Sequence, residues 1–421
     1  MSNKAFPNDW CTIRLGDVCR KAALANPQKK TDWLFRYVDV SGVSNEAFQI
    51  VETKKLMGRE APSRARKLIE TDDVIFATVR PTLRRVALIP HELNGQICST
   101  GYCVIKANRE NLEPAYAYYY LLTDHVNSQV ENLQKGATYP AINDSDLFDL
   151  LIPLPPLPEQ RAIARALRSV QEAKEARRRE LALERERKAA LMQHLFTHGT
   201  RGEPTKQTEI GEMPESWEVV KLGEMALDIG SGVTPKGGEK FYLKSGIPLI
   251  RSQNVLMNRL SIDEVAYISK ETHMAMIRSA IQPGDVLLNI TGASIGRVAY
   301  VPDYLKVANV NQHVCRIRLK GDVAPEFVSF YLAFHKGQSQ IMGFQFGTTR
   351  QGLNYGNVKA LRIPLPALTE QNKITNTLKA CDAKLAVLER ELALLDEFFR
   401  AMLEELMTGR LSAKPLIETI S

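Results

Sequence analysis

The amino-acid sequence predicts an α+β protein in which two mixed α/β domains form a pseudo-twofold repeat and are separated by an antiparallel two-helix coiled coil. The main observation is a proline-rich stretch followed by a helical pattern, which occurs at Leu150–Leu167 and again at Leu361–Leu378. Equivalent positions of the two copies differ by a constant 211 residues, so chance similarity is a poor explanation. The chain of 421 residues is also too long for one ordinary core, and two to three domains are expected.

Strand-like patterns repeat ahead of each proline-rich stretch. The segment Trp10–Asp17 (WCTIRLGD) matches Trp217–Glu224 (WEVVKLGE), and Asp72–Pro90 matches Gly284–Pro302. The longer pair predicts a strand, a turn and a second strand in each half, and each half has an ordinary domain size. The expected segments are a first domain at 1–157, a first long helix at 158–199, a linker at 200–216, a second domain at 217–367, a second long helix at 368–410 and a tail at 411–421.

Two long helices follow the prolines, which hold the chain extended up to each helix start. Glu159 and Glu370 stand in the first turns, where the helix dipole favours an anion. The first helix is apolar at its ends and charged in its middle, which fits either a solvated helix with ion pairs or long Lys and Arg stems lying across the partner helix. We expect the helices to pair antiparallel within one chain; a homodimeric coil is the alternative. The coiled-coil positions of the second helix are Ile374, Leu378, Cys381, Leu385, Leu388, Leu392, Leu395, Phe399, Met402 and Leu406.

Composition sets broad limits on the function. The formal charge of +7, from 55 Lys and Arg against 48 Asp and Glu, allows a polyanionic partner but is weak evidence alone. The six cysteines show no C-x-x-C pairing, so buried thiols are expected rather than a zinc site. No apolar run is long enough to span a membrane and the N-terminus lacks a signal pattern, so we expect a cytoplasmic protein without a membrane partner.

Motifs for catalysis are missing from the sequence. There is no G-x-x-x-x-G-K-[ST] loop for nucleotide phosphates and no group of carboxylates followed by lysine that would suggest a nuclease. Asn26-Pro27-Gln28 does not complete the N-P-P-Y-type tetrad of adenine methyltransferases. Binding is therefore the expected function. The alternatives are a DNA methyltransferase whose motifs have diverged and a coiled-coil scaffold without a DNA role.

Polar side chains that suit contacts to DNA bases occur on expected loops of the second half. Recognition of base edges needs paired donors or acceptors on loops that enter a groove; Arg suits guanine, and Gln and Asn suit adenine. Gly352, in the last of these loops, permits close backbone approach. The alternative is that these are ordinary loop residues that cap turns. The candidates are Arg251, Ser252, Gln253, Asn254, Asn289, Thr291, Thr349, Arg350, Gln351 and Asn354.

The first half offers a basic cluster that suits DNA phosphates, whose contacts dominate affinity; a solvated basic face is the alternative. Arg85 and Arg297 occupy equal places in the repeat and suit a structural role as well as a phosphate contact. The aromatic residues at 118–120 and 327–331 have helical spacing and are expected in the core rather than stacked on bases. The histidines have no spacing typical of metal ligands. The candidates in this half are Arg64, Arg66, Arg80, Arg84, Lys135, Thr138 and Tyr139.

The chain resembles the specificity subunit of type I restriction-modification systems. The resemblance extends from Trp10 to about Arg410 and depends on W-x4-L-G-[DE], on G-D-V-L-L-N-I-T-G-A-S-I-G-R-V-A, and above all on the duplicated I-P-L-P-x-L-x-E-Q before a long helix. It departs from the pattern in the first half, where Val79–Arg84 stands in place of Thr291–Gly296. The glycine-permitted turn of the second half is therefore not expected in the first.

The resemblance implies a non-catalytic, DNA-binding subunit. Each domain would be a target-recognition domain for one half of a split double-stranded DNA sequence, and the helices would act as a ruler between them. The helices would also dock two methyltransferase subunits, and the assembly would recruit restriction subunits for defence against phage. No cofactor or metal is expected on this chain, since S-adenosylmethionine would be bound by the partner methyltransferase.

Overall fold

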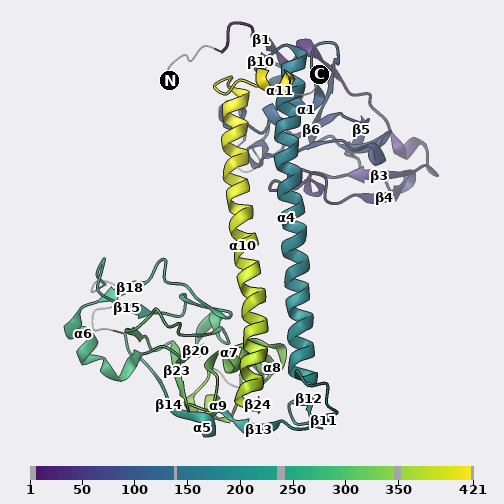
Figure 1. Ribbon diagram of the computed structural model, residues 1–421. Helices are drawn as coiled ribbons and strands as arrows, with labels where there is room; N and C mark the ends of the chain where they lie inside the picture. Colours follow the sequence, from purple (N-terminus) through teal and green to yellow (C-terminus); the bar gives the residue numbers. More distant parts are fainter. Residues whose placement is uncertain (1–5, 137–139, 235–241, 346–351, 419–421) are drawn as a thin grey trace. The chain divides into compact units, whose positions relative to one another are not determined.

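A computed structural model describes residues 6–136, 140–234, 242–345 and 352–418 (Figure 1). The chain divides into two compact units, unit 1 made of Met1–Arg179 with Glu389–Ser421 and unit 2 made of Glu180–Leu388. Each unit contains one mixed α/β domain and parts of both long helices, α4 (Leu157–His198) and α10 (Leu368–Met407). The predicted fold class, with its repeat and its helix pair, is confirmed.

The domain of unit 1 contains two four-stranded sheets and one two-stranded sheet. Its elements are β1 (Cys11–Arg14), β2 (Cys19–Lys21), β3 (Leu34–Val38), β4 (Lys54–Met57), β5 (Ala65–Ile69), β6 (Val74–Ala77), β7 (Val86–Leu88), β8 (Gln96–Ser99), β9 (Tyr102–Ala107), α1 (Pro114–Tyr120), α2 (Asp124–Leu133), α3 (Asp144–Phe148), β10 (Leu151–Leu154) and, after α10, α11 (Lys414–Glu418). The strand orders are β2-β9-β6-β7, β4-β3-β8-β5 and β1-β10. Strands β3 and β8 run parallel, whereas the other pairs of these sheets are antiparallel.

The domain of unit 2 repeats these sheets. Its elements are β11 (Thr205–Thr208), β12 (Gly211–Pro214), β13 (Glu218–Lys221), α5 (Leu222–Met225), β14 (Ala226–Ser231), β15 (Ile247–Ile250), β16 (Val255–Leu256), β17 (Arg259–Leu260), β18 (Ala266–Ile268), α6 (Lys270–Ala275), β19 (Ala280–Ile281), β20 (Val286–Asn289), β21 (Val298–Tyr300), β22 (Ala308–Val310), β23 (Val314–Leu319), α7 (Pro325–Ala333), α8 (His335–Gly343), α9 (Tyr355–Ala360) and β24 (Arg362–Leu365). The orders β14-β23-β20-β21, β18-β15-β22-β19 and β13-β24 correspond one by one to those of unit 1.

The strand register repeats along with the strand order. Phe76 pairs with Cys103 in unit 1, and Leu288 pairs with Cys315 in unit 2. Every residue of β6 and of β20 is buried. This burial on both faces explains why these strands are apolar at consecutive positions instead of alternating with polar residues.

The duplicated proline-rich stretch forms a short strand before each long helix. Pro153 in β10 pairs with Thr12 in β1, and Pro364 in β24 pairs with Val219 in β13. A proline has no N–H to donate to a sheet. Each two-stranded ribbon leaves one edge of the strand unpaired, so the missing donor is tolerated there.

The glutamate of each Glu-Gln pair fastens a tryptophan of the domain to the start of a long helix. Glu159 is buried and accepts a hydrogen bond from Trp10 Nε1 at 3.1 Å. Glu370 is buried in the same way and accepts from Trp217 Nε1 at 3.4 Å. These carboxylates therefore do more than favour the helix dipole, because each one satisfies a buried indole donor.

The glutamine of each pair holds the chain on both sides of its helix start. Gln160 Nε2 donates to the carbonyl of Pro155, and Gln371 Nε2 donates to the carbonyl of Pro366, both at 2.8 Å. Their Oε1 atoms accept from the backbone N–H that precedes α1 at 2.9 Å and α7 at 2.8 Å, respectively. The helix start, the proline strand and the aromatic helix of each domain are thereby joined by one side chain.

Helices α4 and α10 pack antiparallel within the chain, as predicted. In unit 1, Lys174 of α4 lies 2.5 Å from Asp396 and over the ring of Phe399, with 4.6 Å to its centroid. In unit 2, Lys188 of α4 forms an ion pair with Asp382 of α10. The charged middle of α4 thus lays its long Lys stems across the seam of α10, which was one of the two interpretations of that segment.

Three smaller expectations have clear outcomes. The segment expected as a linker contains the hairpin β11–β12, whose turn ends at Gly211 with φ +97°, a conformation that favours glycine. All six cysteines are free thiols; Cys11 is exposed, and burial raises the pKa of Cys98 and of Cys315 to about 12. The expected core aromatics are buried, and they are Tyr118, Tyr119, Tyr120, Phe327, Phe330 and Tyr331.

Candidate nucleic-acid interface

The ends of three neighbouring strands meet at one end of a four-stranded sheet in unit 2. Strand β14 ends at Ser231, which pairs with Cys315 near the start of β23, and β20 ends at Asn289, which pairs with Val314. Because β23 runs antiparallel to both neighbours, the segments that follow β14 and β20 lie beside the segment that precedes β23. Loops from distant parts of the sequence therefore gather at one place.

The turn after β20 has left-handed residues at the same two repeat positions as the turn after β6. In unit 2 these are Gly292 at φ +75°, which begins a single 3-10 turn, and Gly296 at φ +87°, which follows it. In unit 1 the 3-10 turn is bounded by Arg80 at φ +50° and Arg84 at φ +52°. The expectation that the first half lacks this turn is therefore wrong. Arginines occupy the left-handed positions that favour glycine, at a cost of roughly 1–2 kcal/mol each.

A second segment closes onto each turn through an isolated β-bridge. Val79 pairs with Ala141 in unit 1, and Thr291 pairs with Gly352 in unit 2. Ala141 also pairs with Lys135, with both backbone hydrogen bonds at 3.0 Å. The arginine turn and Lys135, which the sequence predicted separately, are thus brought together. We call these regions the loop ends of the two domains; they comprise residues 78–85, 99–101, 135 and 140–142 in unit 1, and 231–234, 290–297, 311–313 and 352–354 in unit 2.

The remaining basic candidates of unit 1 have different surroundings. Arg64 is exposed, and its carbonyl accepts from the N–H of Thr100 in the loop end at 2.8 Å. Arg66 donates to Gln28 Oε1 at 2.9 Å, and Arg84 forms an ion pair with Asp124. Arg64 therefore lies beside the loop end, Arg66 is bonded away from it, and the guanidinium of Arg84, although Arg84 is a residue of the loop end, contacts α2. Thr138 and Tyr139 lie outside the described residues.

The three candidate asparagines of unit 2 hold backbone segments in place. Asn254 is buried; its Oδ1 accepts from the N–H of Arg251 at 3.0 Å, and its Nδ2 donates to the carbonyl of Ser261, on the far side of the β16–β17 hairpin, at 3.1 Å. Asn289 is buried and donates to the carbonyl of Ser252 at 2.8 Å. Asn354 caps α9 by accepting from a backbone N–H of its first turn at 2.8 Å. This is the turn-capping role that the sequence analysis left open for such residues.

The other polar candidates of unit 2 are only partly described. The guanidinium of Arg251 lies over the ring of Tyr242, 5.3 Å from its centroid. Ser252 is half-buried and Gln253 is exposed. Thr349, Arg350 and Gln351 lie outside the described residues.

Three polar side chains that the sequence analysis did not select join Thr291 at the loop end of unit 2. The hydroxyl of Thr234 donates to Gln312 Oε1. Gln312 Nε2 lies 3.1 Å from His313 Nε2, and His313 Nδ1 lies 2.5 Å from Thr291 Oγ1. The available signal was local: an Asn-Gln-His run stands between two buried strands, β22 and β23.

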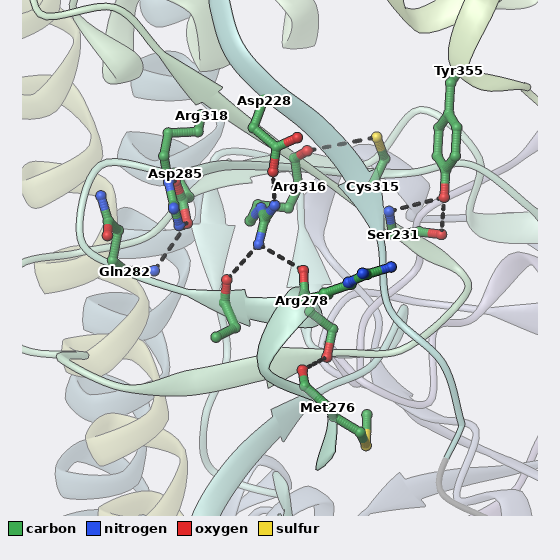
Figure 2. A network of polar contacts seen from close by, with 12 residues as sticks. Asp228, Ser231, Met276, Arg278, Gln282, Asp285, Cys315, Arg316, Arg318 and Tyr355 are labelled. Carbon is green, nitrogen blue, oxygen red and sulfur yellow. Dashed lines mark hydrogen bonds and ion pairs between the residues drawn. The ribbon is translucent and has the colours of Figure 1, made fainter. Parts of the chain in front are cut away.

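A buried arginine connects the two four-stranded sheets of unit 2 (Figure 2). Arg316 in β23 donates to the carbonyls of Arg278 at 3.0 Å and Ala280 at 2.7 Å, and it forms an ion pair with Asp228 in β14. Strand β23 belongs to one sheet, and Ala280 begins β19 in the other. The guanidinium therefore holds together the two sheets that carry the loop end. If the sheets moved apart, this buried charge would lose hydrogen-bond partners, which is energetically costly.

Helix α9 is attached to the loop end by a tyrosine, also visible in Figure 2. The hydroxyl of Tyr355 lies 2.5 Å from Ser231 Oγ and accepts from the Ser231 N–H at 3.0 Å. Ser231 is the last residue of β14, so this contact joins the segment before α9 to the segment that leads to Thr234. The segments of the loop end are thus held from several elements, which suits a surface that must keep its shape.

An ion pair repeats in the two domains and is structural. Arg318 donates to both carboxylate oxygens of buried Asp285 at 2.8 Å, and these bonds raise the pKa of Arg318. In unit 1, Lys106 lies 3.3 Å from Asp73, and burial raises the pKa of that carboxyl group. Equivalent positions thus carry the same charge signs with different side chains.

Both loop ends present groups that suit a nucleic acid. Unit 1 presents the exposed cations Arg80 and Lys135, and unit 2 presents the exposed cation Arg297; these groups suit phosphates. Unit 2 also presents the hydroxyl, amide and imidazole groups of Thr234, Gln312 and His313, which suit base edges. In the described part of the chain, no group of three or more His, Cys, Asp or Glu is placed to hold a metal ion. Over the same residues, no helix has both the length and the apolar character that crossing a membrane requires.

Comparison with known proteins gives the family. A family model described as the type I restriction modification DNA specificity domain matches residues 7–185 and again residues 214–397. The chain belongs to this family. The family consists of non-catalytic specificity subunits, which recognise DNA sequences while partner subunits carry the catalytic activity.

Two relatives of this specificity subunit match it over nearly their whole length. The type I restriction enzyme MjaVIII specificity subunit of Methanocaldococcus jannaschii is 26% identical over 434 residues, covering 99% of this chain and 96% of that protein. The putative type I restriction enzyme MjaX specificity subunit of the same organism is 24% identical over 416 residues, covering 97% and 95%.

Two solved structures are similar to the model. One, described as the structural basis of complex assembly and conformational transition of the type I R-M system, has 28% identity and a TM-score of 0.59, covering 97% of this chain and 100% of that one. The S subunit from M. genitalium has the same fold at 17% identity and a TM-score of 0.62, covering 96% and 97%.

Proposed function

We propose that each domain of this specificity subunit recognises one half of a bipartite double-stranded DNA target through its loop end. The observation that carries the proposal is the repeated bridge, Val79 to Ala141 and Thr291 to Gly352, which builds the same surface twice from equivalent positions. The two loop ends share a turn and a bridge but differ in most of their side chains, as expected if each half-site has its own sequence. Arg64, Arg80 and Lys135 are exposed at the loop end of unit 1, where phosphate contacts would dominate affinity.

We further propose that α4 and α10 dock two methyltransferase subunits and that the assembly recruits restriction subunits. Four large apolar side chains on these helices support a protein partner, because they are exposed beside seam residues such as Leu388 and Phe399 that are buried. Leu183 and Val387 are 65% and 55% exposed in unit 2, and Leu394 and Phe398 are 54% and 53% exposed in unit 1. Leu394 and Phe398 line one surface hollow together, and neighbouring exposed apolar side chains of this kind mark interaction surfaces.

In the proposed complex this chain supplies sequence recognition and the partner supplies chemistry. S-adenosylmethionine bound by the methyltransferase would provide the methyl group for a target base extruded from the duplex. The contribution of this chain would be to position that base by holding the flanking sequence. The proposed place of action is the cytoplasm, where the chromosome and incoming phage DNA are both present.

The proposal is tested by mapping DNA methylation in the source cell with and without this gene. We expect deletion to remove methylation from one bipartite motif and a plasmid copy to restore it. An unchanged methylome in the deletion strain would contradict the proposal. The alternative of a methyltransferase with diverged motifs is tested separately, because it requires the purified chain alone to transfer methyl groups from S-adenosylmethionine to DNA.

The ruler role has its own experiment. One additional turn is inserted into the middle of α4, with a matching turn at the facing position of α10. If the helices set the spacing, the unspecified gap of the methylated motif lengthens while both specified halves stay the same. A changed half-site sequence would contradict the ruler role and leave the recognition role standing.

A further inference from the structure

We propose that Gln312 recognises an adenine in the half-site bound by the domain of unit 2, and that Thr234 and His313 fix the orientation of its amide. This inference rests on the proposed function and adds the residue and the base. Gln312 is exposed at the loop end, directly before β23. Its amide is held on two sides while the rest of it remains open to a ligand.

The hydrogen bonds around Gln312 run in one direction. The hydroxyl of Thr234 donates to Gln312 Oε1, so the Nε2 group faces His313 and donates to ring atom Nε2 at 3.1 Å. The lone pair of the imidazole therefore lies on Nε2 and its proton lies on Nδ1. Nδ1 then donates to Thr291 Oγ1 at 2.5 Å. The reversed chain, in which Thr234 accepts and the imidazole proton lies on Nε2, would use the same number of donors and acceptors, so in both arrangements one lone pair of Oε1 and one N–H of Nε2 are taken.

The backbone under these side chains is fixed as well. The N–H of His313 donates to Asn311 Oδ1 at 3.1 Å, and the carbonyl of His313 accepts from the N–H of Ile290 at 3.0 Å. The N–H of Gly232 donates to the carbonyl of Asn311 at 3.1 Å. A Cβ at Gly232 would stand 1.6 Å from the carbonyl oxygen of Val310, so only glycine allows this close approach. The amide of Gln312 is therefore preorganised, which reduces the entropy lost on binding.

The hydrogen-bonding groups of the Gln312 amide that remain unused match those of adenine. Thr234 uses one lone pair of Oε1, and His313 uses one N–H of Nε2. One lone pair and one N–H remain, and no described residue takes either of them. In the major groove adenine offers the N6 amino group as donor and N7 as acceptor, which takes up both. Guanine offers two acceptors there, so the remaining lone pair would face an acceptor.

The alternative is that Gln312 only braces His313 and Thr291. The two roles predict different effects of substitution. If Gln312 only supports its neighbours, its removal loosens the loop end and weakens recognition of the whole half-site. A base contact, when removed, relaxes one position of the half-site, by about 5- to 150-fold in the preference for the correct base, and leaves its other positions specified.

The first measurement is the methylated motif in the deletion strain carrying variants of this gene. Gln312→Ala is expected to relax one adenine of the second half-site, and Gln312→Glu is expected to disfavour that adenine, because Glu keeps the acceptor and loses the donor to N7. The first half-site is an internal control, and Gln207→Ala, at an exposed position of β11, is the matched control variant. A motif unchanged in both Gln312 variants would overturn the inference.

The second measurement uses the complex purified through a tag on this chain. Each adenine of the second half-site is replaced in turn by 7-deazaadenine, which lacks the N7 acceptor, and binding is measured by competition. The wild-type complex should lose affinity at one position, and the Gln312→Ala complex should lose that sensitivity alone. Retention of every sensitivity by the variant, or none in the wild type, would overturn the inference even if the variant abolished methylation in the cell. If deletion of the gene leaves the methylome unchanged, the proposed function fails instead.

Discussion

Replacing Arg80 with glycine distinguishes two properties of this residue, its strained backbone conformation and the charge of its guanidinium. Arg80 has φ +50° in a turn whose counterpart in unit 2 uses Gly292 at φ +75°. Removing a left-handed arginine relieves roughly 1–2 kcal/mol. The added glycine loses about 0.5–1 kcal/mol more backbone entropy on folding. These two backbone terms alone place the Arg80→Gly protein between about equal stability and about 1.5 kcal/mol more than the wild type; the contact that Arg80 makes in the fold is lost as well and lowers this figure.

The same substitution should weaken DNA binding although it does not weaken the fold. If the guanidinium neutralises one phosphate, its loss lowers the slope of log K against log salt concentration by about 0.9. The melting temperature should stay unchanged or rise by up to about 6 °C, taking roughly 2–4 °C per kcal/mol for a unit of this size. The assays are thermal unfolding of the purified chain and fluorescence anisotropy of the purified complex with target DNA across about 50–200 mM salt.

Two variants serve as controls for the Arg80 prediction. Arg84→Gly relieves the same backbone conformation, but its guanidinium contacts Asp124 and the carbonyl of Leu122 at 3.3 Å, so the salt slope should not change. Gly292→Arg is the reverse substitution; a Cβ there meets no atom of the described residues within 4 Å, so the Cβ has room although φ +75° strains the backbone, and the slope should become steeper. If Arg80→Gly lowered the melting temperature and left the salt slope as in the wild type, both parts of this reasoning would be refuted.

The remaining predictions concern stability and thiol chemistry. Glu370→Ala leaves the buried Trp217 indole without its acceptor and should cost about 2–4 kcal/mol, whereas Glu209→Ala, which breaks an exposed ion pair, should cost less than about 1 kcal/mol in the same thermal unfolding experiment. In a thiol-labelling assay at about pH 8, exposed Cys11 should react at once and Cys98 only after denaturation, and rapid labelling of Cys98 in a Cys11→Ser chain would contradict its burial. The pKa of Cys98 rises on folding from 9.0 to about 12, so the unfolded chain loses this proton first and the free energy of unfolding should fall as the pH rises through that interval.

The architecture could be predicted because it follows from local sequence patterns that occur twice. The prolines before each long helix, the heptad seam of α10 and the apolar strands β6 and β20 each follow from residue type and spacing alone. Whether the charged middle of α4 is solvated or packs on α10 could not be predicted from such patterns. Lys174 looks solvated in the sequence, and its burial depends on Asp396 and Phe399, which lie more than two hundred positions away.

The candidate site was only partly predictable. Residue type suggested asparagines, but Asn254, Asn289 and Asn354 use their amides on nearby backbone groups, which a sequence pattern does not distinguish from contacts to DNA. Gln312 was missed because its surroundings, Thr234 and Thr291, come from two other loops.

The sequence by itself determined the repeat, the two domains, the helix pair and, through its duplicated motifs, the family. Tertiary structure alone decided that Arg80 takes a glycine conformation and that Thr234, Gln312 and His313 form one chain of hydrogen bonds. The physical reason is that periodicity and turn chemistry act over a few residues, whereas the direction of a polar side chain is set by whichever donors and acceptors the fold brings to it.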